Sequence, residues 1–472
     1  MNHLHTAKVI ATMWPAIDKE TVLSKIINQI DIFKISVSNS DEDVTRKYVH
    51  MVLKLDNSKS ILLDIQWPDV RTRNKEELVV KKWQKFRLIS TESFKNEAKT
   101  IYIDYAHVDD LRVGAHLHID HGEVVIEVVE NDKDKGVYGK IVQWGSIRIN
   151  RVVEFTHYIP QLPFLSESDK KHILWWVEQK ISLISLWGIK DATDLVHLRD
   201  YLREIGGWHL KILPRIDTKE AIEHFSEIVQ SADGVIVDPI KGELLLGDAF
   251  ADTKHDMIAT CNRFGKPMLM HVELDVAQKP AAIKANQRII QDHVHAWVDV
   301  FILNHETAIS EYPIEMITLL HDTINDTPTN TDLPIIPLQD LPLTKDNTIT
   351  DYIIYNAYRA SKELNIKAII CPTESGYTAA RLSTLKPHVP IISFTKNDDA
   401  FRYLNLLRWV KGYKIAPTFG YENIKQIGKE IIRILFKGNI SLDDKILIVH
   451  SSLEQNIPHM INGIEIYKFK DI

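Results

Sequence analysis

Short apolar runs recur along the chain, and stretches with helical periodicity separate them. Runs of this kind are typical of buried parallel strands. The first eight lie at residues 8–13, 32–37, 61–66, 183–188, 210–216, 234–239, 267–273 and 300–303. Eight strand–helix units predict an α/β fold with a TIM (β/α)8 barrel, formed by residues 1–72 and 161–322.

Two other regions have different patterns. Residues 73–160 contain alternating apolar and polar positions, which predict an inserted small β-barrel domain with antiparallel strands. Residues 323–347 are rich in Thr, Asp and Pro and read as a linker. In residues 348–472, apolar runs at 368–371, 390–394, 414–415 and 445–449 alternate with helices, which predicts a C-terminal α/β domain with a mainly parallel sheet.

The amino-acid composition excludes several classes of protein. The chain has 472 residues, of which 44% are apolar and 26% charged, as in ordinary globular proteins. A net charge of −7 without a long basic run argues against a nucleic-acid surface. Cys261 and Cys371 are too few and too far apart for a disulfide framework. No apolar run reaches the ~18 residues of a membrane span, and we expect a cytoplasmic protein with no membrane partner.

Polar residues follow several of the predicted barrel strands. Because active sites of TIM barrels lie at the carboxyl ends of their strands, these residues form the candidate site. They are Ser36, Ser38, Asp64, Gln66, Arg215, Asp217, Lys241, Asn304 and Glu306.

Seven segments along the chain resemble motifs of the pyruvate kinase family. S-I-L-L-D-I-Q-W-P-D-V-R-T at 60–72 is similar to the family's L-L-D-T-K-G-P-E-I-R-T, and V-I-A-T-M-W-P-A at 9–16 to its I-V-x-T-I-G-P-A. The others are F-K-I-S-V-S-N-S, I-L-P-R-I-D-T, A-D-G-V-I-V, L-N-H-E-T-A and T-E-S-G-Y-T-A-A-R-L-S. Their order and spacing match from about residue 8 to 462.

The resemblance implies phosphate transfer from phosphoenolpyruvate to ADP, with magnesium and potassium as cofactors, in a homo-oligomer that is tetrameric in the family. It also assigns substrate-binding or catalytic positions to Lys34, Arg71, Arg215 and Val272. The family's magnesium ligands correspond to Asp217 and Lys241, and its potassium ligands to Ser36, Ser38, Asp64 and Ile65.

Several of these positions have changed chemically. Arg215 replaces the catalytic lysine and presents a wide planar fork. Lys241 replaces a metal-binding aspartate, although Glu243 lies two residues later as a substitute ligand. Val272 replaces the proton-donating threonine and has no proton to give. We expect degraded metal and proton-donor sites, while Asp64, Arg71 and Asp217 are equally explained as buried charges retained for their partners.

Two further motifs carry weaker hypotheses. Thr373, Ser375, Gly376 and Thr378 resemble the family loop that binds effector phosphates, but Glu374 adds an unfavourable charge. His116, His118 and His121 suggest a metal site, yet a solvated strand end is the better interpretation because no cysteine or carboxylate cluster accompanies them.

Six tryptophans fall where the family pattern has glycine: Trp14, Trp67, Trp144, Trp176, Trp297 and Trp409. Tryptophan supplies neither the positive φ nor the small size for which glycine is used. One hypothesis is that the gene reads UGA as glycine, and the alternative is genuine aromatic replacement in a diverging protein.

Three functions remain open from the sequence. The first is a degenerate phosphotransferase that retains anion or nucleotide binding with weak or no standard activity. The second is an active, divergent pyruvate kinase of glycolysis. The third is a non-catalytic regulatory or interaction subunit.

Overall fold

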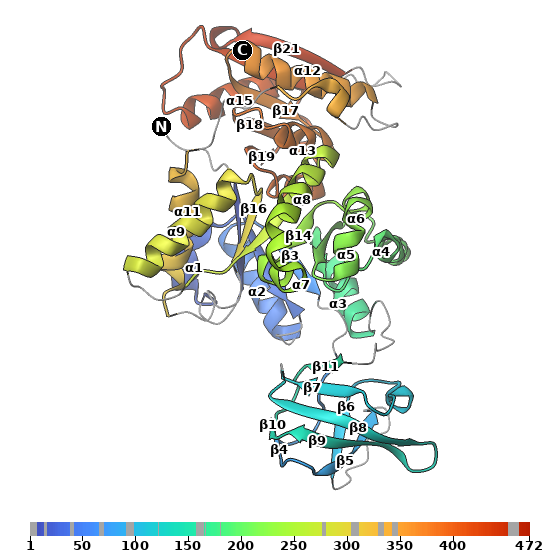
Figure 1. Ribbon diagram of the computed structural model, residues 1–472. Helices are drawn as coiled ribbons and strands as arrows, with labels where there is room; N and C mark the ends of the chain where they lie inside the picture. The colour runs from blue at the N-terminus through green and yellow to red at the C-terminus, as the bar shows by residue number, and fades with distance from the viewer. Residues whose placement is uncertain are drawn as a thin grey trace. The chain divides into compact units, whose positions relative to one another are not determined.

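The computed structural model describes residues 7–13, 17–37, 42–65, 70–90, 99–120, 122–156, 165, 167–179, 181–275, 280–303, 311–328, 335–341, 348–451 and 462–472. The chain divides into two compact units (Figure 1). The first comprises Met1–Gln66 and Lys171–Ile472, and the second comprises Trp67–Lys170.

The first unit contains a closed barrel of eight parallel strands, in the order β1-β16-β15-β14-β13-β12-β3-β2. The strands are β1 (Lys8–Thr12), β2 (Ile32–Ser36), β3 (Ser60–Ile65), β12 (Leu183–Leu186), β13 (Lys211–Ile216), β14 (Val235–Val237), β15 (Met268–Val272) and β16 (Val300–Leu303). All eight match the apolar runs within a few residues at each end. The predicted TIM barrel is therefore confirmed.

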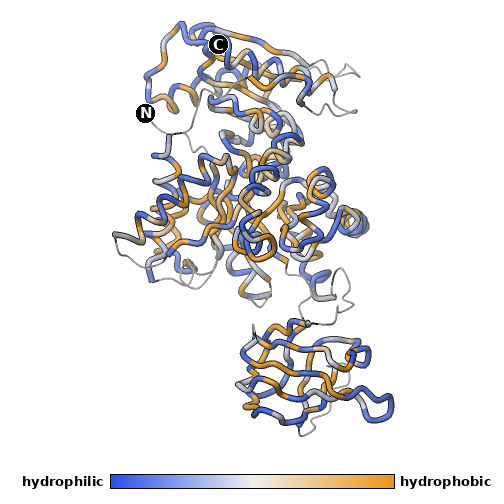
Figure 2. Tube along the Cα trace, in the orientation of Figure 1, coloured by the Kyte–Doolittle hydropathy of each residue, from blue (hydrophilic) through white to orange (hydrophobic). Residues whose placement is uncertain are grey.

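Helices follow the strands and cover the barrel, and Figure 2 shows apolar residues concentrated along the strands. The helices are α1 (Glu20–Ile26), α2 (Glu42–Leu55), α3 (Glu167–Glu178), α4 (Ala192–Glu204), α5 (Lys219–Glu223), α6 (Phe225–Ser231), α7 (Pro239–Leu246), α8 (Phe250–Phe264), α9 (Pro280–His295) and α11 (Pro313–Asp326). Side-chain caps begin several of them. Asp191 accepts a hydrogen bond from the Thr193 N–H at the start of α4, and Thr218 accepts one from the Ala221 N–H at the start of α5.

The second unit consists of β strands around one apolar core. Its strands are β4 (Leu78–Val80), β5 (Lys85–Ser90), β6 (Thr100–Ile103), β7 (His116–Ile119), β8 (Val124–Asp132), β9 (Gly136–Gln143), β10 (Gly145–Ile147) and β11 (Val153–Thr156). In the described residues they form a six-stranded sheet, β11-β7-β8-β9-β5-β6, and a two-stranded sheet, β10-β4. Arg71 and Thr72 bridge the two edges of the six-stranded sheet, pairing with Val152 beside β11 and with Ile103 in β6. This closure fits the expected small β barrel, in which β5 and β6 pair in parallel.

The C-terminal domain of the first unit has a five-stranded sheet in the order β19-β18-β17-β20-β21. Its strands are β17 (Ile366–Pro372), β18 (Ile391–Thr395), β19 (Val410–Lys414), β20 (Lys445–Ser451) and β21 (Asn462–Lys468), with helices α12 (Thr348–Glu363), α13 (Tyr377–Thr384), α14 (Asp398–Leu404) and α15 (Tyr421–Leu435). The mainly parallel sheet is confirmed, and only β21 pairs antiparallel, with β20.

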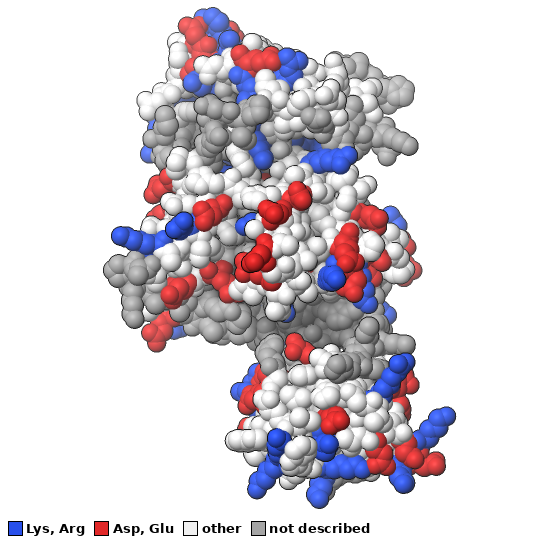
Figure 3. All heavy atoms as spheres, viewed as in Figure 1, with Lys and Arg blue, Asp and Glu red and all other residues white. Residues whose placement is uncertain are grey.

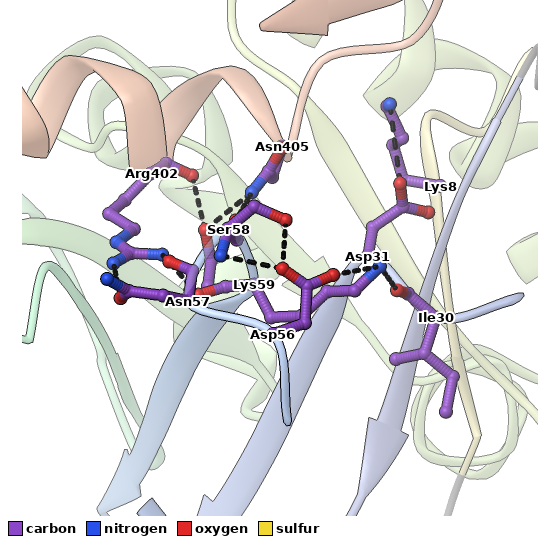
Figure 4. A network of polar contacts seen from close by, with 10 residues as sticks. Lys8, Ile30, Asp31, Asp56, Asn57, Ser58, Lys59, Arg402 and Asn405 are labelled. Atoms are coloured by element: carbon purple, nitrogen blue, oxygen red, sulfur yellow. Dashed lines mark hydrogen bonds and ion pairs between the residues drawn. The ribbon is translucent and has the colours of Figure 1, made fainter. Parts of the chain in front are cut away.

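The C-terminal domain contacts the amino ends of the barrel strands. Arg402 donates to the Asn57 carbonyl at 2.7 Å, and Ser60 at the start of β3 donates to the Arg402 carbonyl at 2.9 Å (Figure 4). Asn405 donates to the Ser58 carbonyl at 3.1 Å. One buried apolar cluster also includes residues of both parts. The opposite end of the barrel, where the strands finish, is the barrel mouth.

Candidate active site at the barrel mouth

Four charged residues meet at the barrel mouth because parallel strands finish at the same end. Lys34 lies in β2, Asp64 in β3 and Arg215 in β13, while Asp238 directly follows β14. All four are buried, with 4–6% of each residue exposed. Burial of four charges requires that they neutralise one another.

Lys34 and Asp64 form the first pair, with 3.4 Å between Nζ and Oδ2. The Ser185 hydroxyl donates to Asp64 Oδ1 at 2.6 Å, and the Trp187 indole N–H donates to the same oxygen at 3.0 Å. Burial opposes ionisation of Asp64, but Lys34 and these donors together hold the pKa of Asp64 below its usual value. Burial lowers the pKa of Lys34, against the effect of Asp64.

Arg215 forms the second pair. Its Nη2 donates to Asp238 Oδ2 in a short contact, and its Nε lies 4.0 Å from Asp217 Oδ2. The guanidinium also stacks on the Trp187 ring, 3.6 Å from the ring centre, as a cation–π contact. Arg215 is therefore enclosed by groups of its own chain.

Asp217 lies just past the end of β13, with 10% of its side chain exposed. Burial raises the pKa of Asp217 to about 6, although the nearby Arg215 charge and the hydrogen bond from the Gly188 N–H favour the carboxylate. This carboxyl consequently titrates closer to neutral pH than an exposed aspartate does.

The Asp238 side chain has two structural roles: it binds Arg215 and it caps α7. Its Oδ2 binds Arg215, and its Oδ1 accepts from the N–H groups of Ile240 at 3.1 Å and Lys241 at 3.4 Å, which caps α7. Sequence reasoning missed Asp238, Ser185 and Trp187, which contact the charged residues of the mouth only in the folded chain. The signal for Asp238 was its position between a buried strand and Pro239, which marks a helix start.

The other expected site residues lie in several places. Val272 is buried at the end of β15, and Ile65 is buried at the end of β3. Ser36 is half-buried at the end of β2, while Lys241 is exposed in the first turn of α7. Five expected positions lie outside the described residues, namely Ser38, Gln66, Trp67, Asn304 and Glu306.

Arg71 belongs to the second unit. Its guanidinium donates to the Asn150 carbonyl at 3.1 Å, and its backbone N–H donates to Asp104. These contacts account for its position within that unit, and its role in substrate binding stays a prediction.

The described mouth residues do not fit a magnesium site. Asp64 and Asp238 each have a cationic partner, and the Lys241 charge is close enough to act on Asp217. Over the part of the chain that the structure describes, no group of three or more His, Cys, Asp or Glu could hold a metal ion. In the H-L-H-I-D-H motif, His118 bonds Thr156 at 3.0 Å, His116 contacts the Gly114 carbonyl and His121 lies outside the described residues.

The expected effector loop precedes α13. The Thr373 hydroxyl accepts from the Gly376 N–H at 3.1 Å, and Gly376 has φ of 84°. Ser375 accepts from the Tyr377 N–H at 3.4 Å, so side chains of the loop already bind two backbone N–H groups at the start of α13. Phosphate binding by this loop, including Thr378, stays a prediction.

Comparison with known proteins gives a consistent result over most of the chain. Residues 4–317 match the family model for the pyruvate kinase barrel domain, and residues 351–467 match that for the pyruvate kinase alpha/beta domain. The pyruvate kinase of Staphylococcus epidermidis is 25% identical over 412 residues, covering 84% of this chain and 70% of the relative. That of Geobacillus stearothermophilus is 26% identical over 423 residues, covering 87% and 71%. Among the described residues, no helix is both long and apolar enough to cross a membrane. The matches to both domain models show that the chain belongs to the pyruvate kinase family.

Proposed function

We propose that this protein is a degenerate phosphotransferase, which binds phosphoenolpyruvate and ADP weakly and transfers phosphate slowly or not at all. One observation carries the proposal: each buried cation at the mouth already has a carboxylate partner. Lys34 is paired with Asp64, and Arg215 with Asp238. A substrate anion must therefore compete with carboxylates of the chain itself.

Phosphate transfer requires cations that face the transferring group and a proton source for the enolate. Arg215, at the position of the family's catalytic lysine, is enclosed between Asp238 and Trp187. Val272, at the position of the proton donor, is a buried aliphatic side chain. Loss of a general acid alone typically lowers a rate by about 10²- to 10⁴-fold.

The cofactor sites of the family are degraded in the same way. Magnesium is held mainly by carboxylates, and an ammonium at Lys241 repels it. For potassium, Ile65 offers no side-chain oxygen, and the Asp64 carboxylate is engaged by Lys34 and Ser185. We infer that neither ion binds here as strongly as in an active pyruvate kinase. Homo-oligomerisation is carried over from the family as a proposal, which light scattering tests.

A coupled pyruvate assay tests the proposal, with magnesium or manganese and potassium present. We expect very low turnover in the unmodified protein and a higher rate in the triple variant Val272→Thr, Arg215→Lys, Lys241→Asp. Robust pyruvate formation by the unmodified protein would overturn the proposal in favour of an active, divergent pyruvate kinase. Thermal stabilisation by phosphoenolpyruvate or ADP without turnover supports it, whereas the absence of both points to a non-catalytic subunit.

A further inference from the structure

The Asp238 carboxylate lies where two anion-binding elements converge. The first is the amino end of α7, whose Ile240 and Lys241 N–H groups point at Oδ1. The second is the guanidinium of Arg215, which binds Oδ2. Helix amino ends favour negative charge, and arginine forks bind carboxylates and phosphates strongly.

Both oxygens of this carboxylate are thus engaged in the way that a bound anion would be. The pair is almost fully removed from water, since Arg215 is 5% and Asp238 6% exposed. The Trp187 ring covers the face of the guanidinium at 3.6 Å. In the described residues, Arg215 Nε has no hydrogen-bond partner, so the guanidinium retains capacity for a further acceptor.

We propose that Asp238 is a positioning residue that occupies an anion site with the chain's own carboxylate. The proposal rests on the proposed function and explains its weak substrate binding. Asp238 keeps Arg215 turned toward α7 and excludes small carboxylate or phosphate anions. Removal of the Asp238 charge opens this site, so Asp238 determines which anions the mouth accepts.

Calorimetric titration with oxalate and with inorganic phosphate tests this inference on the full chain. Asp238→Ala removes both roles of the side chain, whereas Asp238→Asn keeps an oxygen that can cap α7 and removes only the charge. We expect at least tenfold tighter oxalate binding in both variants than in the unmodified protein. Asp238→Glu retains the charge and should keep binding weak.

Two controls separate this role from a merely structural one. Asn397→Ala removes another helix cap, at the start of α14 in the C-terminal domain, and should leave oxalate affinity unchanged. Adding Arg215→Met to Asp238→Asn should abolish the gain in oxalate affinity. Unchanged or weaker oxalate binding in Asp238→Asn, with a native circular dichroism spectrum, would overturn the inference. These titrations involve no turnover, so they stay informative even if the unmodified protein forms pyruvate.

A second inference rests on backbone conformation. Three tryptophans have positive φ: Trp83 at 69°, Trp297 at 69° and Trp409 at 66°. This region favours glycine and tolerates asparagine or aspartate, but a bulky side chain there is a genuine outlier.

Hydrogen bonds show why these positions need positive φ. At the end of α9, the Trp297 N–H donates to the Val294 carbonyl and the Val298 N–H to the His293 carbonyl, which is the Schellman arrangement that favours glycine. Trp83 occupies the third position of the turn closed by the Gln84 N–H and the Lys81 carbonyl. Trp409 occupies the third position of the turn closed by Val410 and Leu407. A positive φ at that position requires glycine or asparagine.

Cation–π contacts offset part of this strain, since Lys82 and Lys140 lie over the Trp83 ring, and Lys386 and Arg408 over the Trp297 ring. Trp83 is 63% exposed, and the buried Trp409 indole N–H has no hydrogen-bond partner in the described residues. We infer that the protein made in its own organism carries glycine at 83, 297 and 409, encoded by UGA. This adds Trp83 to the positions suspected from sequence. Trp176, in the interior of α3, and Trp144 are not in this region of backbone conformation.

Coding DNA and peptide masses from the native organism test this second inference directly, with UGA codons and glycine masses expected at the three positions. In recombinant protein with tryptophan there, Trp297→Gly should raise the thermal midpoint by several degrees. Trp208→Gly, at an exposed position without positive φ, should not raise it. UGG codons or tryptophan masses at the three positions would overturn the inference.

Discussion

The two ends of the barrel bind arginine side chains in different ways. At the mouth, Arg215 is neutralised by the side chain of Asp238. At the amino ends of the strands, Arg408 of the C-terminal domain donates to the Val298 carbonyl at 3.1 Å, and Arg402 donates to that of Asn57 at 2.7 Å. One end binds arginine through side chains, and the other binds it mainly through the backbone.

This difference explains why the fold can persist while the chemistry of the site changes. A backbone carbonyl is present whatever residue occupies the position, so contacts such as that of Arg408 persist while the sequence diverges. Contacts between side chains change with every substitution, and those at the mouth now join Lys34, Asp64, Arg215 and Asp238 into internal pairs.

On the face shown in Figure 3, acidic and basic side chains are interspersed over the surface, where water and salt screen them. The buried charges at the mouth are screened much less, so a substitution there changes the chemistry more.

The largest effect should come from Arg408→Met, at the C-terminal domain end. Arg408 is 1% exposed, and its removal leaves the Val298 carbonyl without its donor and the nearby Asp299 with one cation fewer, beside Lys386. We expect the free energy of unfolding to fall by about 3–5 kcal/mol, as when a buried charge loses its partner. Denaturant unfolding measures this loss.

Arg359→Met provides the matched control for this experiment. Arg359 pairs with Glu363 at 2.7 Å on the exposed face of α12, where solvent screening leaves ion pairs with little effect on stability. A similarly small loss for Arg408→Met would show that the backbone contacts do not hold the domains together.

The second prediction uses one aspartate at each end of the barrel. Burial raises the pKa of Asp217 at the mouth and of Asp299 at the opposite end to about 6. Because the folded pKa exceeds the unfolded value, each neutral carboxyl favours the folded state fully below about pH 4. This stabilisation is lost as the pH rises through about 6, by up to about 3 kcal/mol per group.

Asp217→Asn and Asp299→Asn should each reduce the decline in stability between pH 4 and 7. Urea unfolding across this range measures the slopes, and Asp443→Asn, at an exposed position, should leave the slope unchanged in this window. An unaltered slope in Asp217→Asn alone would mean that the mouth is more hydrated than the opposite end.

The third prediction concerns magnesium at the mouth. Lys241→Asp replaces repulsion by attraction next to Asp217, so we expect magnesium affinity to rise by about 30-fold, or about 2 kcal/mol after screening by solvent. Titration calorimetry measures the affinity, and Glu243→Gln shows separately whether this substitute carboxylate on the same helix takes part in binding. Tight magnesium binding by the unmodified protein would contradict the degraded site.

The fold was largely predictable because buried parallel strands are continuous apolar runs. The run at 414–415 indicated the wrong bounds, since β19 covers Val410–Lys414 at the sheet edge, and its sequence V-K-G-Y-K contains two lysines and a glycine. Asn462 and Gly463 form a dipeptide that is typical of a hairpin turn, but they begin β21 and pair with Ser451 and His450. Edge strands of mixed polarity give weaker signals than central ones.

The candidate site was predictable only in part. The end of the barrel followed from the strand pattern, and the charged residues Lys34, Asp64 and Arg215 do meet there. Their pairing did not follow, because it depends on which carboxylate the backbone brings within reach of the guanidinium. Asp238 lies three residues before Lys241, where the resemblance placed the metal ligand, and both the cap of α7 and the contact with Arg215 hold its side chain.

The smallest effect compares two serines near β12. Ser185 donates to Asp64 at the mouth at 2.6 Å, and Ser182 donates to Asp399 of the C-terminal domain at 2.8 Å. Ser185→Ala should lower the free energy of unfolding by about 1.5 kcal/mol, because its acceptor is a buried carboxylate, and Ser182→Ala by about 0.5–1 kcal/mol.

The pH dependence of stability should also differ between the two serine variants. Since the pKa of Asp64 is lowered in the folded state, its stabilisation is present above the unfolded pKa of ~4 and is lost as the pH falls below that value. Ser185→Ala should move this loss to higher pH in acid unfolding monitored by tryptophan fluorescence, whereas Ser182→Ala should not. Equal acid midpoints in the two variants would show that Lys34 and the Trp187 N–H maintain the Asp64 carboxylate without Ser185.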